Sequence, residues 1–273
     1  RENLKWFEHR PLFGLRVGVT RPIDQAGPQI DRLIELGAQP VLMPTIEIRP
    51  VDSWSEVDKS IARLSNFDWL LFTSVNGVRV LLDRLFETGG DARQLGHLKL
   101  AAIGSSTAEA LRAYGLRADI VPAEFRAESL ADSLKSLVAG KQVLWARASR
   151  GRDVLPRELI AAGAAVEELV VYQNLDVEAF SEPTLSQLEN GDVDWICLSS
   201  PSIARGVASL LSEAARHQVG RKTRIASISP VTSEAARSCG LPIDAEATTF
   251  TWDGIFAAIQ AHVQRSDAAR AGS

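Results

Sequence analysis

The stretch Asp68–Asn76 reads DWLLFTSVN, and Asp194–Ser202 reads DWICLSSPS, so the chain repeats one pattern after 126 positions. In both copies an acidic residue precedes a short apolar run, and two hydroxyl side chains follow that run. Short, nearly continuous apolar runs are typical of strands that are buried on both faces of a parallel sheet. Both stretches are therefore predicted to be buried strands that end in a polar turn before a helix.

The repeat extends along most of the chain. Arg21 and Arg147 also stand 126 positions apart, and the segments 103–110 and 228–235 align at a shift of 125. One gap of a single residue is thus enough to bring two half-chains into register. This self-similarity indicates an internal duplication of a whole folding unit.

Each half alternates apolar strand patterns with helical ones. Val78, Leu81, Leu82, Leu85 and Phe86, for example, follow the helical period on one face. Strands that alternate with helices predict parallel sheets covered by helices. Ten strands in 273 residues fit two five-stranded α/β domains better than one wide sheet. The expected strands are 15–20, 40–43, 68–73, 99–103, 118–121, 141–147, 165–171, 194–199, 224–228 and 243–245.

Composition and charge argue against several classes of function. The chain is 45% hydrophobic and 23% charged, with a net charge of −4. An acidic total provides no field to attract nucleic acid, and no apolar run approaches the ~20 residues of a membrane span. The first residues do not follow the pattern of a secretion signal. We therefore expect a cytoplasmic protein that binds neither nucleic acid nor a membrane.

Cysteine, histidine and tryptophan positions indicate packing rather than chemistry. Cys197 and Cys239 are expected to be buried thiols in preference to a disulfide, and the four histidines lack metal-ligand spacing. Trp69, Trp145 and Trp195 lie inside predicted strands and are expected in the core. The phosphate-binding patterns GxxxxGK[S/T] and GxGxxG and the hydrolase pattern GxSxG are also missing from the sequence. Neither a metal nor a cofactor is expected.

Polar side chains follow the strand ends in both halves. Ligands of open parallel sheets bind beyond the carboxyl ends of the strands, and hydroxyl groups there can either cap the next helix or contact the ligand. Arg21 and Arg147 occupy equivalent strand ends, where a guanidinium can bind a carboxylate in a planar fork. For Arg150 and Arg152 a solvated loop is an equally good reading. Tyr172 closes the stretch ELVVYQN and either reaches a ligand or packs at a linker.

Six motifs follow one another along the chain: VTRP (19–22), FTSVNGV (72–78), AIGSSTAEAL (102–111), VVYQN (170–174), LSSPSIARG (198–206) and SISPVTSEAA (227–236). Their order and spacing resemble the uroporphyrinogen-III synthase family, over about residues 14–262. The resemblance implies two flavodoxin-like parallel-sheet domains from a duplicated, crossed-over chain, joined by a two-stranded hinge with a cleft between them. Residues 1–45 and 174–273 would form one domain and 50–170 the other, with linkers at 46–49 and 171–173.

The resemblance also implies an enzyme that needs no cofactor. Its substrate would be hydroxymethylbilane, a linear tetrapyrrole whose cyclisation with inversion of ring D and loss of water yields uroporphyrinogen III. Tyr172 matches the family tyrosine that assists departure of the hydroxyl. Ser229 departs from the family, which usually has glycine there, so that an amide contact to a carboxylate is in doubt. The predicted substrate contacts are Arg21, Thr73, Ser74, Asn76, Ser105, Thr107, Arg147, Ser199, Ser200, Ser202, Ser229 and Thr232.

Two further expectations concern the ends of the chain and its partners. The stretch LKWFEHRPLFG (4–14) resembles the linker to the methyltransferase in bacterial fusion proteins, which predicts a synthase excised from such a fusion. A monomer is expected, with residues 1–13 and 265–273 frayed. The alternative is a non-catalytic domain of the same hinged fold that binds a tetrapyrrole or another small polyacid. Product formation from hydroxymethylbilane distinguishes the two.

Overall fold

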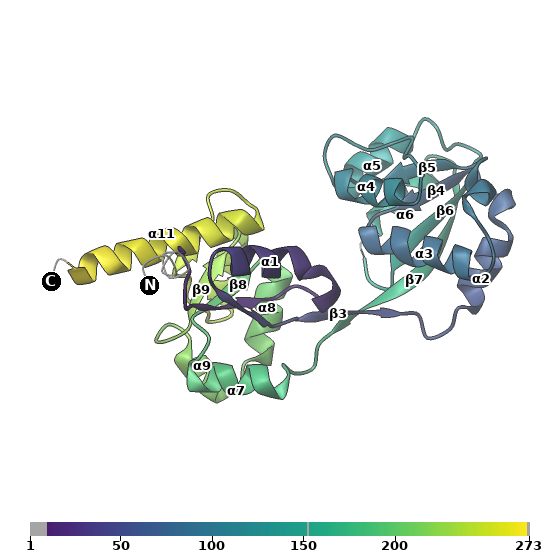
Figure 1. The fold of residues 1–273 in the computed structure, drawn as a ribbon. Helices are drawn as coiled ribbons and strands as arrows, with labels where there is room; N and C mark the ends of the chain where they lie inside the picture. Colours follow the sequence, from purple (N-terminus) through teal and green to yellow (C-terminus); the bar gives the residue numbers. More distant parts are fainter. Residues whose placement is uncertain (1–9, 152, 272–273) are drawn as a thin grey trace, which may run out of the picture. The chain divides into compact units, whose positions relative to one another are not determined.

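The computed structural model describes residues 10–151 and 153–271, whose ten strands form two five-stranded sheets (Figure 1). These residues divide into two compact units. Unit 1 contains residues up to Glu47 and from Leu175 onward, and unit 2 contains Ile48–Asn174. The chain passes between the units along β3 (Ile46–Pro50) and β7 (Ala165–Asp176). Among the described residues, every helix is too short or too polar to cross a lipid bilayer.

Unit 1 has the strand order β10-β9-β8-β1-β2, with parallel pairing between neighbours. Counted along the chain within the unit, this is the order 2-1-3-4-5 of flavodoxin-like folds. Trp195 and Cys197 of β8 face α1 and α11, whereas Ile196 and Leu198 face α8 and α10. The elements are β1 (Arg16–Val19), η2 (Ile23–Gln25), α1 (Gly27–Glu35), β2 (Gln39–Leu42), α7 (Glu182–Asn190), β8 (Trp195–Leu198), α8 (Pro201–Leu210), α9 (Glu213–Gln218), β9 (Arg224–Ser227), α10 (Pro230–Ser238), β10 (Ala245–Glu246) and α11 (Trp252–Ala271).

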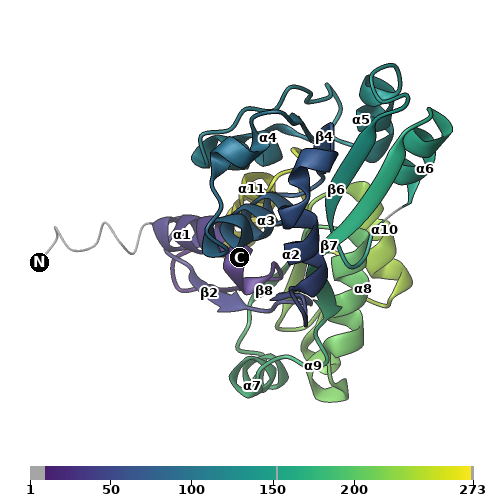
Figure 2. The ribbon, with the colours of Figure 1, turned by 90° about the vertical axis from the view of Figure 1, so that its right-hand side faces the viewer.

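Unit 2 has the order β5-β4-β6-β7-β3. By the sequence repeat, its first four strands correspond to β9, β8, β1 and β2 of unit 1, and β3 (Ile46–Pro50) is the fifth strand, beside β7. Leu70 and Phe72 of β4 face α2, α3 and α4, and Trp69 and Leu71 face α5 and α6. Figure 2 shows these two groups of helices on the two sides of the sheet. The elements are α2 (Ser55–Ala62), η3 (Leu64–Asn66), β4 (Trp69–Phe72), α3 (Val75–Glu87), η4 (Ala92–Leu95), β5 (Lys99–Ala102), α4 (Ser105–Ala113), α5 (Ala127–Leu134), β6 (Gln142–Ala148) and α6 (Val154–Ala161).

The predicted α/β fold with parallel sheets is confirmed, and nine of the ten expected strands are present. The expected strand 118–121 is wrong, because only Ile120 forms an isolated bridge, to Ala101. Pro122 follows directly and has no N–H with which to extend the ladder. Trp69, Trp145 and Trp195 are buried as expected. Phe86 is 40% exposed, and it packs on Tyr114 with ring centroids 5.8 Å apart instead of entering the core.

The ends of the chain and one cysteine also differ from expectation. Leu12 is fully buried in the core of unit 1, and its N–H bonds the carbonyl of Leu36 at 2.9 Å, so residues 10–13 do not fray. Residues 1–9 and 272–273 lie outside the described part of the chain. Helix α11 continues to Ala271, which contradicts fraying from residue 265. Cys197 is buried, and burial raises the pKa of its thiol, whereas Cys239 is partly exposed; neither forms a disulfide.

Aspartate side chains hold the beginnings of the strands in both units. Asp68 Oδ2 accepts a hydrogen bond of 2.8 Å from the first N–H of β6, and Asp194 Oδ2 accepts one of 2.7 Å from the first N–H of β1. Asp119 and Asp244 bond N–H groups of β5 and β9 in the same way, at 2.8 and 2.9 Å. A charged acceptor makes a stronger hydrogen bond than a neutral one. The duplicated aspartates of the sequence are therefore duplicated structural contacts.

The contact of Asp68 predicts a pH-dependent loss of stability. The backbone N–H of Gln142, and then the Lys141 ammonium, hold the pKa of Asp68 below its ordinary value. A lowered pKa in the folded state contributes stability that is present above the unfolded pKa of about 3.9 and is lost as pH falls through the folded pKa. We expect Asp68→Asn to be less stable than wild type at pH 7, and this difference to shrink between pH 4 and pH 2 in urea unfolding.

The control for this measurement is Asp52→Asn, at an exposed carboxylate of the same unit. Because that side chain is exposed, the substitution should cost less stability at pH 7 than Asp68→Asn does. A difference for Asp68→Asn that does not change with pH would mean that the carboxylate contributes by shape alone.

Candidate functional site at the carboxyl edges of the sheets

Strand β4 of unit 2 ends in two hydroxyl residues that both make hydrogen bonds. Ser74 is the N-cap of α3, and its Oγ accepts a hydrogen bond of 2.9 Å from the N–H of Gly77. Thr73 Oγ1 accepts a hydrogen bond of 3.1 Å from the indole N–H of Trp145. The first N–H groups of a helix have no partner within the helix, so a serine directly before it is favoured at this position. Both side chains are half-buried at the strand end.

The phenol of Tyr172 reaches the same position from β7. Its hydroxyl donates a hydrogen bond of 3.0 Å to Ser74 Oγ, although β6 lies between β7 and β4. The pairing of β6 with β7 is irregular after Arg147, so that Tyr172 stands opposite Ala148. Side chains of a regular strand alternate between its two faces, which would place Tyr172 on the same face as the exposed Val170. Tyr172 instead packs in the core between the sheet and α3 and is 5% exposed. A strand irregularity can re-aim a side chain in this way.

A glycine allows the first turn of α3 to approach β6 closely. A Cβ atom on Gly77 would lie 3.2 Å from the carbonyl oxygen of Ala146 and 3.2 Å from Ser74 Oγ. The first turn of α3 therefore rests directly on β6. Asn76, which is 8% exposed, belongs to the same turn.

Two further predicted residues follow β5, the neighbour of β4. Ser105 and Thr107 lie in the first turn of α4, where Ser105 is exposed and Thr107 is 4% exposed. A shallow, open depression lies beside them and is lined by Val75, Ser105 and Glu109 among others. The structure thus brings Thr73, Ser74, Asn76, Ser105, Thr107 and Tyr172 to one edge of the unit 2 sheet.

Arg147 already has anionic partners within unit 2. Its guanidinium forms ion pairs with Glu168 and, at 3.6 Å, with Asp153, and it lies 4.5 Å from the ring centre of Trp145. The side chain is also buried, so a ligand carboxylate would have to compete with these partners. Arg150 is exposed, and Arg152 lies outside the described residues.

Unit 1 ends β8 in the same way as unit 2 ends β4. Ser200 is the N-cap of α8; its Oγ accepts a hydrogen bond of 3.2 Å from the N–H of Ile203 and lies 2.9 Å from Ser202 Oγ. Ser199 is half-buried beside it. The cap is therefore common to both units, but its second partner differs. In unit 1 that partner is a serine, and in unit 2 it is a phenol.

Strands β9 and β1 complete the edge of unit 1. Ser229 caps α10, and its Oγ lies 3.1 Å from Thr232 Oγ1, which is nearly fully buried. The Ser229 hydroxyl is therefore hydrogen-bonded within the turn. Arg21 donates a hydrogen bond of 2.8 Å to Gln25 Oε1; burial lowers its pKa, and Asp24 opposes that shift. An arginine with a lowered pKa is still a cation at neutral pH.

A buried hydroxyl chain behind α10 was missed by the sequence reading. Ser227 and Ser233 are fully buried with their Oγ atoms 2.5 Å apart, and Ser233 donates to Glu246. Together they attach the first turn of α10 to β9 and β10, and so they orient Thr232. The four hydroxyl residues between positions 227 and 233 were a sequence signal for this chain of hydrogen bonds. Only the tertiary packing shows which of these hydroxyl groups are buried.

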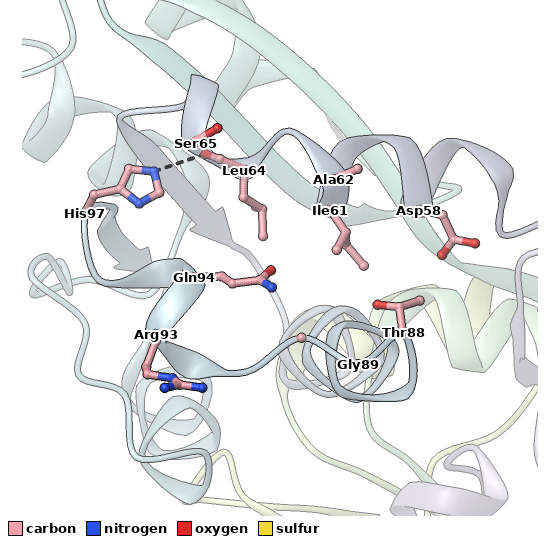
Figure 3. Close-up of a pocket in the computed structure, with 11 residues that line it drawn as sticks. Asp58, Ile61, Ala62, Leu64, Ser65, Thr88, Gly89, Arg93, Gln94 and His97 are labelled. Carbon is pink, nitrogen blue, oxygen red and sulfur yellow. Dashed lines mark hydrogen bonds between the residues drawn. The ribbon is translucent and has the colours of Figure 1, made fainter.

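A separate pocket lies at the opposite edge of the unit 2 sheet (Figure 3). It has a volume of about 610 Å³ and is lined by Ile61, Leu64, Gln94 and His97 among others, in segments that precede β4 and β5. The His97 ring hydrogen-bonds the carbonyl of Leu64 at 3.1 Å, and the Gln94 side chain extends into the pocket. None of the predicted site residues lines this pocket.

Comparison with known proteins identifies what this arrangement resembles. Residues 29–257 match the family described as uroporphyrinogen-III synthase HemD. The chain is 32% identical to a uroporphyrinogen-III synthase of Synechococcus elongatus, over 92% of this chain and 96% of that protein. It is 30% identical to the porphyrin biosynthesis protein HemD of Ruminiclostridium josui, over 77% of this chain and 42% of that protein. A crystal structure of a mutant uroporphyrinogen III synthase from Thermus thermophilus is similar in fold, with a TM-score of 0.61 and 19% identity over 92% of this chain and all of that one.

The contact of α3 with β6 predicts unequal effects for two glycine substitutions. Gly77→Ala forces a Cβ against a strand carbonyl, so we expect it to lower the free energy of unfolding by about 1 kcal/mol. Gly27→Ala, at the first residue of α1, places its Cβ where nothing lies within 4 Å. It should change the free energy of unfolding by less than about 0.5 kcal/mol, because the restriction of the unfolded chain is offset by Pro28, which disfavours a helical residue with a Cβ before it. Urea unfolding followed by circular dichroism measures both, and equal effects would contradict the close contact at Gly77.

Proposed function

The chain belongs to the uroporphyrinogen-III synthase family, and on that basis we propose how its side chains act. It is an enzyme of tetrapyrrole biosynthesis, a lyase whose substrate is a small tetrapyrrole. Our specific proposal is that it cyclises hydroxymethylbilane to uroporphyrinogen III with inversion of ring D, and that Tyr172 assists the first step. The observation that carries the proposal is the hydrogen bond between Tyr172 and Ser74 at a sheet edge where ligands of this fold class bind.

The first step is departure of the terminal hydroxyl as water. The oxygen needs a proton as its bond to carbon breaks, and the electrons of the adjacent pyrrole form an azafulvene electrophile. A phenol has an ordinary pKa of about 10, so it is protonated at neutral pH and can act as a donor. The electrophilic carbon then attacks the substituted position of ring D to form a spiro intermediate. Opening and reclosure of this intermediate invert the ring, and a final proton loss completes the product.

Most of the catalytic work is selection of geometry. The free electrophile also closes on the unsubstituted carbon of ring D, which leads to the type I isomer. An enzyme that holds the chain ends in one arrangement supplies rate and selectivity by positioning. Hydroxyl groups, helix N-terminal amides and the Arg21 guanidinium suit the carboxylates of such a substrate. We assign this binding role to the predicted contacts of both sheet edges, with Arg147 as the weakest candidate because of its internal ion pairs.

Three finer expectations remain part of this proposal. They are a monomeric state, a location in the cytoplasm and a link to a uroporphyrinogen-III methyltransferase. The competing function is a domain that binds a tetrapyrrole without converting it. A phenol held at the sheet edge by a hydrogen bond favours catalysis, because binding of carboxylates alone does not require a proton donor.

Turnover is the direct test of the proposed function. The protein, incubated with freshly prepared hydroxymethylbilane, should give uroporphyrinogen III faster than the spontaneous cyclisation gives the type I isomer. The two isomers are separated by chromatography after oxidation to the porphyrins. Type I product alone, formed at the spontaneous rate, would leave only the non-catalytic alternative.

Removal of one hydroxyl tests the role of Tyr172. We expect Tyr172→Phe to lower kcat about 10²-fold with little change in KM, because general acid assistance contributes about 10²–10⁴-fold and the ring remains in place. The matched control is Tyr114→Phe, at the second of the two tyrosines of the chain. The Tyr114 hydroxyl bonds Asp83 at 2.7 Å, and burial together with Asp83 raises its pKa to about 12. That control should retain the wild-type kcat, and an equal loss in both variants would argue against a specific role of Tyr172.

A further inference from the structure

We propose that Ser74 is a second catalytic residue that passes the proton from Tyr172 to the departing hydroxyl of the substrate. This inference rests on the proposed function and assigns a proton path within the same site. It differs from direct donation by the phenol, because the atom that contacts the leaving oxygen is then Ser74 Oγ. Three observations lead to it: the burial of Tyr172, the hydrogen bonds of Ser74, and the comparison of the two repeats.

The side chain of Tyr172 is largely buried. The residue is 5% exposed and belongs to the core between the sheet and α3. Its hydroxyl proton is directed at Ser74 Oγ, at 3.0 Å. Ser74 is half-exposed at the end of β4, so it lies between the buried phenol and the open edge of the sheet.

The hydrogen bonds of Ser74 leave its own proton available for donation outward. A serine hydroxyl has two acceptor lone pairs and one donor proton. Ser74 Oγ accepts from the N–H of Gly77 at 2.9 Å and from the hydroxyl of Tyr172 at 3.0 Å. Both lone pairs are therefore used by donors that are held in place by α3 and β7. With both lone pairs accepting, the geometry of the oxygen directs its own O–H group away from both donors, which is the arrangement that a relay requires.

The step balances without any co-reactant. As the carbon–oxygen bond of the substrate breaks, the leaving oxygen takes the Ser74 proton and departs as water with the electron pair of that bond. Ser74 Oγ takes the proton of Tyr172, which leaves a phenolate. The electrons of the pyrrole form the new exocyclic double bond. The proton that the ring loses in the final step returns through Ser74 to Tyr172, so the enzyme ends in its starting protonation state.

The second repeat shows that helix capping alone does not require this arrangement. Ser200 corresponds to Ser74 and caps α8 by the same contact, yet its Oγ pairs with Ser202 at 2.9 Å. Both tyrosines of the chain lie in unit 2. Both units thus have the serine cap, whereas among the described residues only the Ser74 cap in unit 2 is hydrogen-bonded to a tyrosine. This difference is expected if the hydrogen bond to Tyr172 acts in catalysis.

The test separates the hydroxyl proton of Ser74 from its role as a cap. Ser74→Asn keeps a good N-cap acceptor but cannot exchange one proton for another as a hydroxyl does. Ser74→Thr keeps both functions. We expect kcat to fall about 10²-fold in Ser74→Asn and to stay within about 3-fold of wild type in Ser74→Thr. The double variant Ser74→Asn with Tyr172→Phe should be no slower than either single variant, because both remove the same path.

A second readout reports the protons themselves. In single turnovers with enzyme in excess, the rate measured in mixtures of H₂O and D₂O should depend on deuterium fraction along a curve, because two protons move in one step. Ser74→Asn should lose this curvature. A straight line for wild type, or losses in the two single variants that multiply in the double variant, would overturn the relay.

Stability and the proposed function are controlled separately. Ser212→Asn changes an N-cap of the same kind, on α9, away from the sheet edge, and should leave kcat unchanged. If wild type makes uroporphyrinogen III and Ser74→Asn is equally active, the relay is wrong and the proposed function stands. If wild type makes no type III isomer, the proposed function fails, and the relay fails with it.

Discussion

The hydrogen bond between a strand-end serine and the first turn of the following helix is the constraint on which the site depends. Ser74, Ser200 and Ser229 each accept from a backbone N–H that the helix cannot satisfy itself. The bond fixes where the helix begins relative to the end of the strand. It also places the hydroxyl at the edge where ligands of open parallel sheets bind. Stability of the fold and orientation of the candidate site thus depend on the same atoms.

Unit 2 attaches to this constraint the phenol that we propose as the proton donor. Tyr172 is packed in the core and bonded to a cap, so its hydroxyl has little freedom to turn. A group held in this way loses little entropy when the substrate binds, which is the requirement for catalysis by positioning. The contact depends in turn on the absence of a side chain at Gly77, since a larger residue would lift α3 from β6. Packing and chemistry therefore cannot be varied independently at this edge.

The two halves share the hydrogen bonds that hold their strands and helices, but they differ in the contacts of their arginine side chains. The aspartates that hold the strand beginnings and the serines that cap the helices occur in both units. Arg21 and Arg147 occupy equivalent positions, but Arg147 is paired with acidic neighbours, whereas Arg21 bonds the neutral amide of Gln25. Groups that hold the backbone repeat because equivalent strands of both sheets use the same contacts.

The sequence by itself determined the alternation of strands and helices, the duplication and the edge that carries the polar residues, because each follows from local periodicity or from spacing along the chain. It also predicted the strand ends closely enough to name Ser74 and Ser200. Only the tertiary structure decided that β3 takes the fifth place in the unit 2 sheet, that residues 118–121 do not form a strand, and that Tyr172 bonds Ser74. The last of these joins residues 98 positions apart through an irregularity in strand pairing. Such a contact depends on how neighbouring strands align, and no local pattern records that alignment.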